Sequence, residues 1–139
     1  MIVVDTNVVS ELMRPSPAPR VVDWIHAQDQ NELYTTSITL AEIRYGIERL
    51  DAGRRKELFT STAEEIFDAF GEYILPFDRS AALHYAAVVS GRDRLGFPID
   101  GFDAQIAAIC ATHKATLATH NVRDFHDTGI EITNPWHQG

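Results

Sequence analysis

Short apolar runs alternate with longer segments of helical periodicity along most of this chain. Ile2-Val3-Val4 is β-branched and continuous, which is typical of a strand buried on both faces. Further strands are predicted at 33–36, 73–75, 116–119 and 130–132. Because strands that alternate with helices are joined by right-handed crossovers, the pattern predicts an α/β fold with a central, mostly parallel sheet of about five strands flanked by helices.

Helices are predicted between these strands, where apolar residues recur every three to four positions. The segment Pro15–Pro19 interrupts the chain ahead of the first of them. The predicted helices span 21–27, 39–50, 54–70, 79–94 and 102–113. In the helix over 79–94, the stripe expected to face the core consists of Ala82, Tyr85, Ala86 and Val89.

The size and composition are those of one ordinary domain, covering residues 1–139. Hydrophobic residues make up 45% and charged residues 23% of the chain, which is near the average for soluble globular proteins. The single cysteine, Cys110, excludes an intrachain disulfide and suits a reducing cytoplasm. No segment has the pattern of a signal peptide or a membrane span. We therefore expect a cytoplasmic protein that does not contact a membrane.

The formal net charge of −8 is unusual for a nonspecific nucleic-acid binder, because phosphate contacts favour basic surfaces. Clustered carboxylates repel one another unless a cation lies among them, so part of this charge fits a metal site. The acidity also suits a basic protein partner. Solubility alone would explain it equally well.

Five polar residues fall at equivalent places in this map. They are Asp5 after the first strand, Glu42 and Asp103 near helix starts, and Asn121 and Asp124 after the fourth strand. In parallel sheets, ligands bind outside the carboxyl ends of the strands, at the topological switch point. These side chains are therefore expected to converge at one edge of the sheet, although they are far apart in sequence.

Helix capping is the alternative explanation for these acids. Thr39 and Glu42 have the spacing of a capping box, and Asp100 and Asp103 have the same spacing. Asp5 alone would also suit an ordinary turn. Helical phase favours a site at Asp103, because apolar residues follow it three, four and seven positions later. A carboxylate on such a core-facing stripe is costly unless something pairs with it or binds it.

The candidate ligands are oxygen donors, which select Mg²⁺ or Mn²⁺ over zinc. One cysteine, with histidines that lack metal-finger spacing, argues against a structural zinc site. An ion held by carboxylates at a strand edge fits phosphoryl chemistry, where it activates water and stabilises charge on the leaving oxygen. Whether one or two ions bind stays open.

Four segments together resemble the PIN-domain family in order and spacing. They are Ile-Val-Val-Asp5-Thr6-Asn7-Val8, Thr39-Leu-Ala-Glu42-Ile-Arg-Tyr-Gly46, Asp103-Ala-Gln-Ile-Ala107-Ala108, and Ala118-Thr119-His-Asn121-Val-Arg-Asp124-Phe125. The resemblance covers essentially the whole chain, including the closing Asn134-Pro135-Trp136. It is strongest to the VapC-type toxins of bacterial toxin–antitoxin pairs, and within them to the FitB-like branch.

This resemblance implies a PIN-like three-layer domain and a metal-dependent endoribonuclease that uses Mg²⁺ or Mn²⁺. Asp5, Glu42 and Asp103 match the family's three metal-holding acids, and Asp5 and Asp103 match the pair bound most directly. Many family members carry a fourth acid where Asn121 stands in this chain. Asp124, one turn further on, is a candidate for the missing charge. With a neutral Asn121, a second ion should bind more weakly.

The resemblance also implies supporting residues and partners. Thr6 and Asn7 match residues that support the first Asp and contact the scissile phosphate. A homodimer is implied, together with a small antitoxin that binds operator DNA with one end and blocks the acidic pocket with the other, often through an arginine. Such a partner would suit the charge of −8.

The densest basic patch is Arg54-Arg55-Lys56, with Arg49 one helical face away. Contact with RNA would explain this patch, and an ordinary solvated helix face explains it at least as well.

Three other functions would also fit parts of this pattern. An aspartyl-nucleophile phosphatase would need an acid two residues after the first Asp, where this chain has Asn7. A dinucleotide-binding domain would need a glycine-rich turn, and residues 6–12 contain no glycine. The third is a regulatory subunit that acts with an antitoxin in a DNA-bound repressor complex and has little nuclease activity. The three acids favour catalysis over this role, whereas Asn121 leaves it open.

Overall fold

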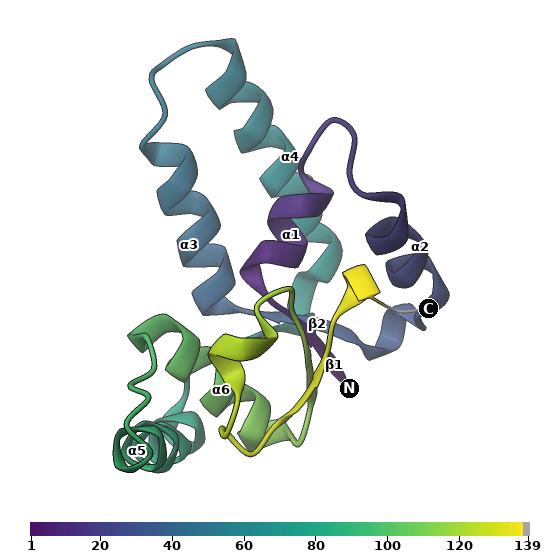
Figure 1. The fold of residues 1–139 in the computed structure, drawn as a ribbon. Coiled ribbons are helices and arrows are strands. Elements are labelled where there is room, and N and C mark those ends of the chain that lie inside the picture. Colours follow the sequence, from purple (N-terminus) through teal and green to yellow (C-terminus); the bar gives the residue numbers. More distant parts are fainter. Residues whose placement is uncertain (138–139) are drawn as a thin grey trace.

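The computed structural model describes residues 1–137 and contains a fully parallel five-stranded sheet (Figure 1). Its order is β3-β2-β1-β4-β5. The strands are β1 (Ile2–Val4), β2 (Leu33–Thr36), β3 (Ile74–Leu75), β4 (Thr116–Ala118) and β5 (Glu131–Thr133). The predicted α/β class is confirmed, and every predicted strand is found with its ends shifted by at most one residue.

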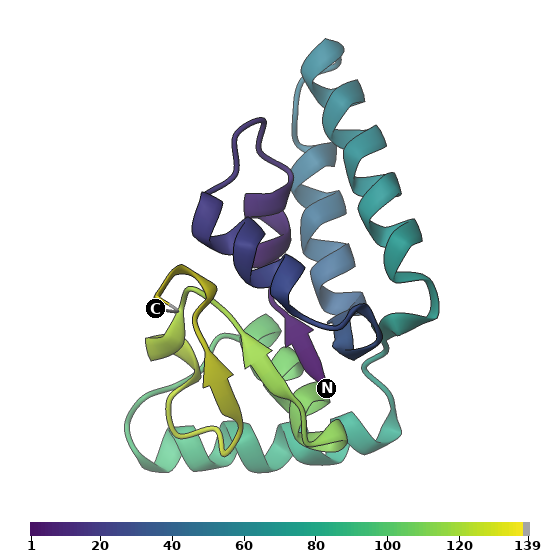
Figure 2. The same cartoon turned by 90° about the vertical axis from the view of Figure 1, so that its right-hand side faces the viewer.

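Within residues 1–137, six α-helices cover the sheet. They are α1 (Thr6–Leu12), α2 (Pro19–Ala27), α3 (Ser37–Glu48), α4 (Arg54–Phe70), α5 (Arg79–Arg94) and α6 (Gly101–His113). Helices α1 to α4 lie on one face of the sheet, and α5 and α6 pack on the other (Figures 1 and 2). The α2 helix begins earlier than predicted because Pro19 occupies its first turn, where a missing N–H costs nothing.

The two core clusters explain the continuous apolar run of β1. Val3 belongs to the cluster with α5 and α6, whereas Val4 belongs to the cluster with α1 to α4. Successive side chains of a strand point to opposite faces, so a strand covered on both sides has no polar position. Both valines are fully buried. The three-layer arrangement expected for the chain is therefore confirmed.

Helix α1 was missing from the predicted elements. Asp5 is its N-cap, and the carboxylate accepts a hydrogen bond from the backbone N–H of Thr6. The helix is short and rich in β-branched residues, which lowers its intrinsic propensity. Burial of Val8 and Val9 therefore stabilises it through tertiary packing. An N-cap residue followed by this apolar pair was the available signal.

The stripe predicted for α5 is wrong at two of its four positions, whereas Tyr85 packs against the core as expected. Ala82 and Ala86 are exposed, while Tyr85 and Val89 are half-buried. The buried positions are Ala81, Val88 and Arg92. An arginine on the buried face breaks the apolar pattern there, so the periodicity favoured the neighbouring positions.

The first turns of α3 and α6 show whether Glu42 and Asp103 serve as helix-capping residues. Thr36 caps α3, and its Oγ1 accepts a hydrogen bond from the Thr39 N–H at 3.1 Å. The capping-box reading of Thr39 and Glu42 is therefore wrong, and Glu42 is left for another role. Asp100 caps α6, where it accepts a hydrogen bond from the Asp103 N–H at 3.4 Å. Capping therefore explains Asp100 and not Asp103.

Over residues 1–137, none of the helices combines the length and the apolar character needed to cross a membrane.

Candidate active site

Three acids meet at the carboxyl edge of the sheet. Asp5 follows β1, Glu42 lies in the second turn of α3, and Asp103 lies in the first turn of α6. One cavity of about 480 Å³ is lined by Asp5, Thr6, Asn7, Ser10, Glu11, Arg14, Glu42, Asp103 and Asn121. These acids lie beside the switch point between β1 and β4, where the parallel sheet was expected to place a ligand.

Asp5 is held in one orientation by three hydrogen bonds. Its Oδ1 accepts one from the Thr6 N–H at 2.8 Å. Its Oδ2 accepts two, from Asn7 Nδ2 at 3.2 Å and from Thr119 Oγ1 at 2.8 Å. Only 3% of the residue is exposed. A carboxylate fixed in this way is preorganised to bind a ligand in the cavity.

Thr119 is a further candidate site residue, with no role expected from the sequence. Its fully buried hydroxyl donates to Asp5 and accepts from Asn7 Nδ2 at 3.1 Å and from the Asn121 N–H at 3.0 Å. It thereby joins the end of β1 to the loop after β4. The available signal was a hydroxyl directly after β4, at the same sheet edge as Asp5.

Thr6 and Asn7 contact the acids, as expected of supporting residues. Thr6 Oγ1 donates to Glu42 Oε1 at 2.8 Å, which fixes the position of that carboxylate. Asn7 donates to Asp5 and Thr119, and its Oδ1 accepts from the His120 N–H at 3.0 Å. Both polar atoms of the Asn7 side chain are therefore engaged within the protein.

The three acids have raised pKa values in the folded protein. Burial is the main cause at Asp5 and Glu42, and their hydrogen bonds only partly offset it. At Asp103, burial and the charges of Asp5, Asp100, Asp124 and Glu42 raise the pKa to about 7. The acids therefore repel one another, and a cation in the cavity would relieve that repulsion.

The donor set fits a magnesium or manganese ion. Within residues 1–137, no three acidic, histidine or cysteine side chains stand close enough to hold one ion together. Mg²⁺ does not require such a group, because it keeps several waters and is commonly bound through one or two carboxylates. Asp5 and Asp103 are the natural pair, since both line the cavity and the charge of Asp5 raises the pKa of Asp103.

The two candidates for the fourth position of the site, Asn121 and Asp124, differ in their relation to the cavity. Asn121 lines the cavity, whereas Asp124 is absent from its lining. The two are joined by a helical turn in which the Asp124 N–H donates to the Asn121 carbonyl at 3.0 Å. The charge of Asp124 nevertheless raises the pKa of both Asp5 and Asp103. Asp124 therefore acts on the acids through space.

We expect the metal-free protein to lose stability as the pH rises from about 5 to about 8. The raised pKa values mean that the folded protein binds more protons than the unfolded chain, so folding takes up protons and becomes less favourable as the pH rises. This penalty is absent below the unfolded pKa of about 4 and is complete above the folded pKa of Asp103, about 7. Thermal unfolding in EDTA across this pH range measures it.

Added MnCl₂ should restore the melting temperature at the upper end of this pH range, and an equal concentration of KCl should restore it less. A melting temperature in EDTA that rises with pH would contradict the repulsion among the acids.

Arg92 is a buried cation that joins the two loops beside the cavity. Its Nε donates to the carbonyl of Phe97 at 2.7 Å, and its Nη1 donates to the carbonyls of Asp124 and His126 at 2.9 Å each. The first loop leads into α6, which carries Asp103, and the second follows β4. Arg92 therefore holds the loops on either side of the site together.

Replacement of Arg92 by methionine is expected to lower the free energy of unfolding by about 2–3 kcal/mol, because three charge-assisted hydrogen bonds are lost. The exposed Arg94 on the same helix offers a control. Its replacement by methionine should change the free energy of unfolding by less than about 0.5 kcal/mol. Urea denaturation measures both, and equal losses would show that Arg92 does not bind the loops as the contacts indicate.

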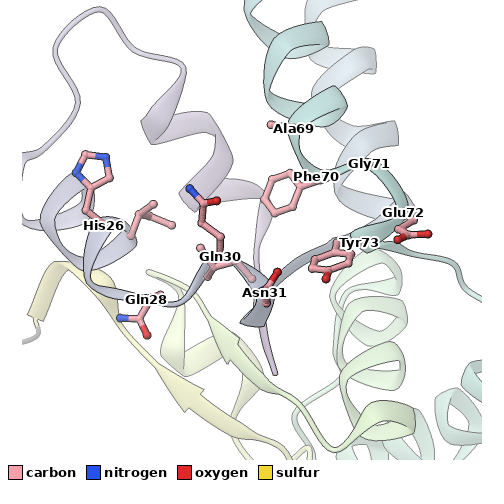
Figure 3. A pocket seen from close by; sticks show the side chains of 11 residues that line it. His26, Gln28, Gln30, Asn31, Ala69, Phe70, Gly71, Glu72 and Tyr73 are labelled. Atoms are coloured by element: carbon pink, nitrogen blue, oxygen red, sulfur yellow. The ribbon is translucent and has the colours of Figure 1, made fainter.

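A second cavity, larger than the one lined by the acids, lies at the amino ends of β2 and β3 (Figure 3). It measures about 870 Å³ and is lined by Ile25, His26, Gln28, Gln30, Asn31, Leu33, Ala69, Phe70, Gly71, Glu72 and Tyr73. Glu72 is the only acid in this lining. The carboxylates that the chemistry needs are therefore in the smaller cavity.

The fold and the site together define the class of protein. It is a parallel α/β domain with a carboxylate site at the switch point of its sheet. The family model for the PIN domain matches residues 2–131. The chain belongs to the PIN-domain family.

Several known proteins are similar over their whole length. The chain is 39% identical to VapC ribonuclease Y4jK of Sinorhizobium fredii, covering 98% of each chain. It is 38% identical to Toxin FitB of Neisseria gonorrhoeae, covering 99% of each. The solved structure of FitAB bound to an IR36 DNA fragment superposes with a TM-score of 0.93 at 37% identity, covering 100% of this chain and 98% of that one. These similarities place the chain with the VapC-type toxins, near the FitB-like branch.

Proposed function

We propose that this protein is the toxin of a bacterial type II toxin–antitoxin pair and cleaves RNA with the help of Mg²⁺ or Mn²⁺. The observation that carries the proposal is the meeting of Asp5, Glu42 and Asp103 in one cavity at the switch point. The names of the similar proteins, a VapC ribonuclease and the toxin FitB, support the same activity. A regulatory subunit with little nuclease activity is not favoured.

In this proposal, Asp5 and Asp103 hold the ion, and Glu42 completes the acidic wall. When bound, such an ion supplies positive charge beside the phosphate and makes water a better nucleophile. Thr6 holds Glu42, while Asn7 and Thr119 hold Asp5. Because both polar atoms of the Asn7 side chain are engaged within the protein, we assign Asn7 to positioning and not to phosphate contact.

Asn121 takes the fourth position in this proposal, because it lines the cavity. Its neutral amide would weaken a second ion relative to an acid at this place. Asp124 supplies negative charge from a short distance without lining the cavity.

The proposed partners are a cognate antitoxin and a second copy of the chain, in the cytoplasm of a bacterium. The similar structure of FitAB is a complex bound to a DNA fragment. For this chain we infer contact with operator DNA only through its antitoxin. A homodimer would cover exposed apolar side chains on α5 and around the loop to α6. These are Leu83, Leu95, Phe97 and Phe102.

The direct test is growth of a bacterial host that expresses the chain without an antitoxin, with RNA 5′ ends mapped before and after induction. Growth arrest with new RNA ends is expected for the wild type and not for Asp5→Asn. Soluble, well-expressed wild-type protein that produces neither would sink the toxin proposal and favour the regulatory role. New ends from Asp5→Asn at the wild-type rate would place the chemistry elsewhere.

A further inference from the structure

The α3–α4 hairpin projects from the body of the molecule (Figures 1 and 2). Its sequence carries a concentration of positive charge. Five of the twelve basic residues of this acidic chain fall between positions 44 and 56, against two acidic residues. From the sequence, this patch fits either a solvated surface or a contact for RNA. Its position relative to the acid-lined cavity favours the contact.

One face of α3 connects the cavity with the basic end of the hairpin. Glu42, Tyr45 and Arg49 are separated by three and four positions and therefore lie on one side of the helix. Glu42 lines the cavity, while Arg49 follows the last residue of α3. The two residues are seven positions apart, which corresponds to about 10 Å along the helix axis and matches the rise of about three stacked nucleotides.

This face offers the contacts that a single strand of RNA requires. Tyr45 is 65% exposed, and the Arg49 guanidinium lies 5.6 Å from the centre of its ring. Beside it, Gly46 leaves open space, with no atom within 4 Å of where a Cβ would stand. An exposed ring beside an arginine is a platform on which a base can stack while the arginine binds a phosphate.

Not every basic side chain of the hairpin is available. Lys56 donates to the Glu48 carbonyl at 3.2 Å and so closes the hairpin, and Arg44 faces Glu64 at 3.9 Å. In contrast, Arg49, Arg54 and Arg55 form no ion pair with any acid of residues 1–137. All three are exposed.

We propose that Tyr45, Arg49, Arg54 and Arg55 form a path along the hairpin that binds one strand of the RNA substrate and leads it to the acid-lined cavity. The inference rests on the proposed ribonuclease function. The cavity itself repels a polyanion, so affinity for RNA must come from outside it. An acidic segment of a partner protein would match the arginines, but it would gain nothing from an aromatic platform aligned with the active site.

Binding of a short, 5′-fluorescein-labelled single-stranded RNA tests the path by fluorescence anisotropy. The protein carries Asp103→Asn to prevent cleavage and is titrated at several salt concentrations. Removal of Arg54 and Arg55 together, each to glutamine, should weaken binding and reduce the slope of log K against log salt by about 1.4, that is about 0.7 per lost phosphate contact. The matched control, Arg79→Gln with Lys114→Gln, makes the same change of charge and should leave the slope unchanged.

The stacking contact is tested separately. Tyr45→Ala should weaken RNA binding by about 5-fold to 150-fold with little change in the salt slope, because base stacking is not electrostatic. Tyr45→Phe keeps the ring and should bind RNA like the parent protein. Weakening by both variants alike would remove stacking from the proposal.

Three outcomes would overturn the path. They are unchanged binding by the Arg54/Arg55 variant, equal loss in the Arg79/Lys114 control, and binding of labelled poly-glutamate that depends on the same arginines and exceeds binding of RNA. The experiments distinguish an error in the proposed RNA path from an error in the proposed ribonuclease function. If the otherwise wild-type protein cleaves RNA while its Arg54/Arg55 variant binds and cleaves equally well, only the path is wrong.

Discussion

Replacement of Asp103 by asparagine is expected to lower the rate of RNA cleavage by at least about 100-fold, since loss of even an outer-shell partner of a metal costs about 10–100-fold. The same change should raise the melting temperature of the metal-free protein at about pH 8. The Asp103 carboxylate accepts no hydrogen bond within residues 1–137, and burial and four neighbouring charges raise its pKa to about 7. Asparagine removes the repulsion and keeps the shape of the side chain.

A substitution that lowers the cleavage rate but raises the melting temperature indicates an acid that is retained for function and not for stability. Asp5→Asn is a less clean probe of stability. The Asp5 carboxylate accepts three hydrogen bonds, so an amide would turn an NH₂ group toward one of their donors. Asp93→Asn, at an exposed position near the end of α5, is the matched control and should change neither property.

Cleavage of a labelled RNA in MnCl₂ and thermal unfolding in EDTA measure the two effects. The Asp103→Asn protein should also lose most of its change in melting temperature between about pH 5 and about pH 8, because the most clearly raised pKa is gone. Full activity in the variant would remove Asp103 from the site, and lower stability at both pH values would show that its charge is compensated in the folded protein.

The layered fold could be predicted because its main signals are local. A continuous β-branched run predicted β1, and the ends of α4 and α5 were predicted to the residue. Convergence of Asp5, Glu42 and Asp103 could also be predicted, since the carboxyl ends of parallel strands share one edge. Helix α1 was not predicted, because its stability comes from the burial of Val8 and Val9 and not from the helix propensity of its residues.

The parts that sequence reasoning missed depend on contacts between distant segments. Arg92 is buried because carbonyls of two separate loops accept its hydrogen bonds. Nothing in its own helix marks it as a core residue. Thr119 likewise gains its role from Asp5 and Asn7, which precede it by more than a hundred residues. A pattern within one element predicts its class, but it does not show the partners of its polar atoms, and in α5 the burial of Arg92 also displaced the predicted face.

We therefore expect the hydroxyl of Thr119 to contribute both to the stability of the fold and to the affinity of the site for a metal ion. Thr119→Val keeps the shape of the side chain but removes the donor to Asp5 Oδ2 and the acceptor for Asn7 Nδ2 and the Asn121 N–H. We expect the free energy of unfolding to fall by about 1–3 kcal/mol, the cost of leaving such groups unpaired. The affinity for Mn²⁺ should fall by about 10–100-fold, because Asp5 loses a hydrogen bond that fixes it.

Thr35 provides the control that separates the two effects. It is equally buried, and its hydroxyl donates to the Val4 carbonyl at 3.0 Å. Thr35→Val should lower the free energy of unfolding by about 1 kcal/mol and leave Mn²⁺ affinity unchanged in calorimetric titration. Thr119→Ser, which retains the hydroxyl, should recover most of the affinity. If Thr119→Val and Thr35→Val reduce stability equally and neither alters Mn²⁺ binding, then Thr119 only packs the sheet edge and the orientation of Asp5 does not depend on it.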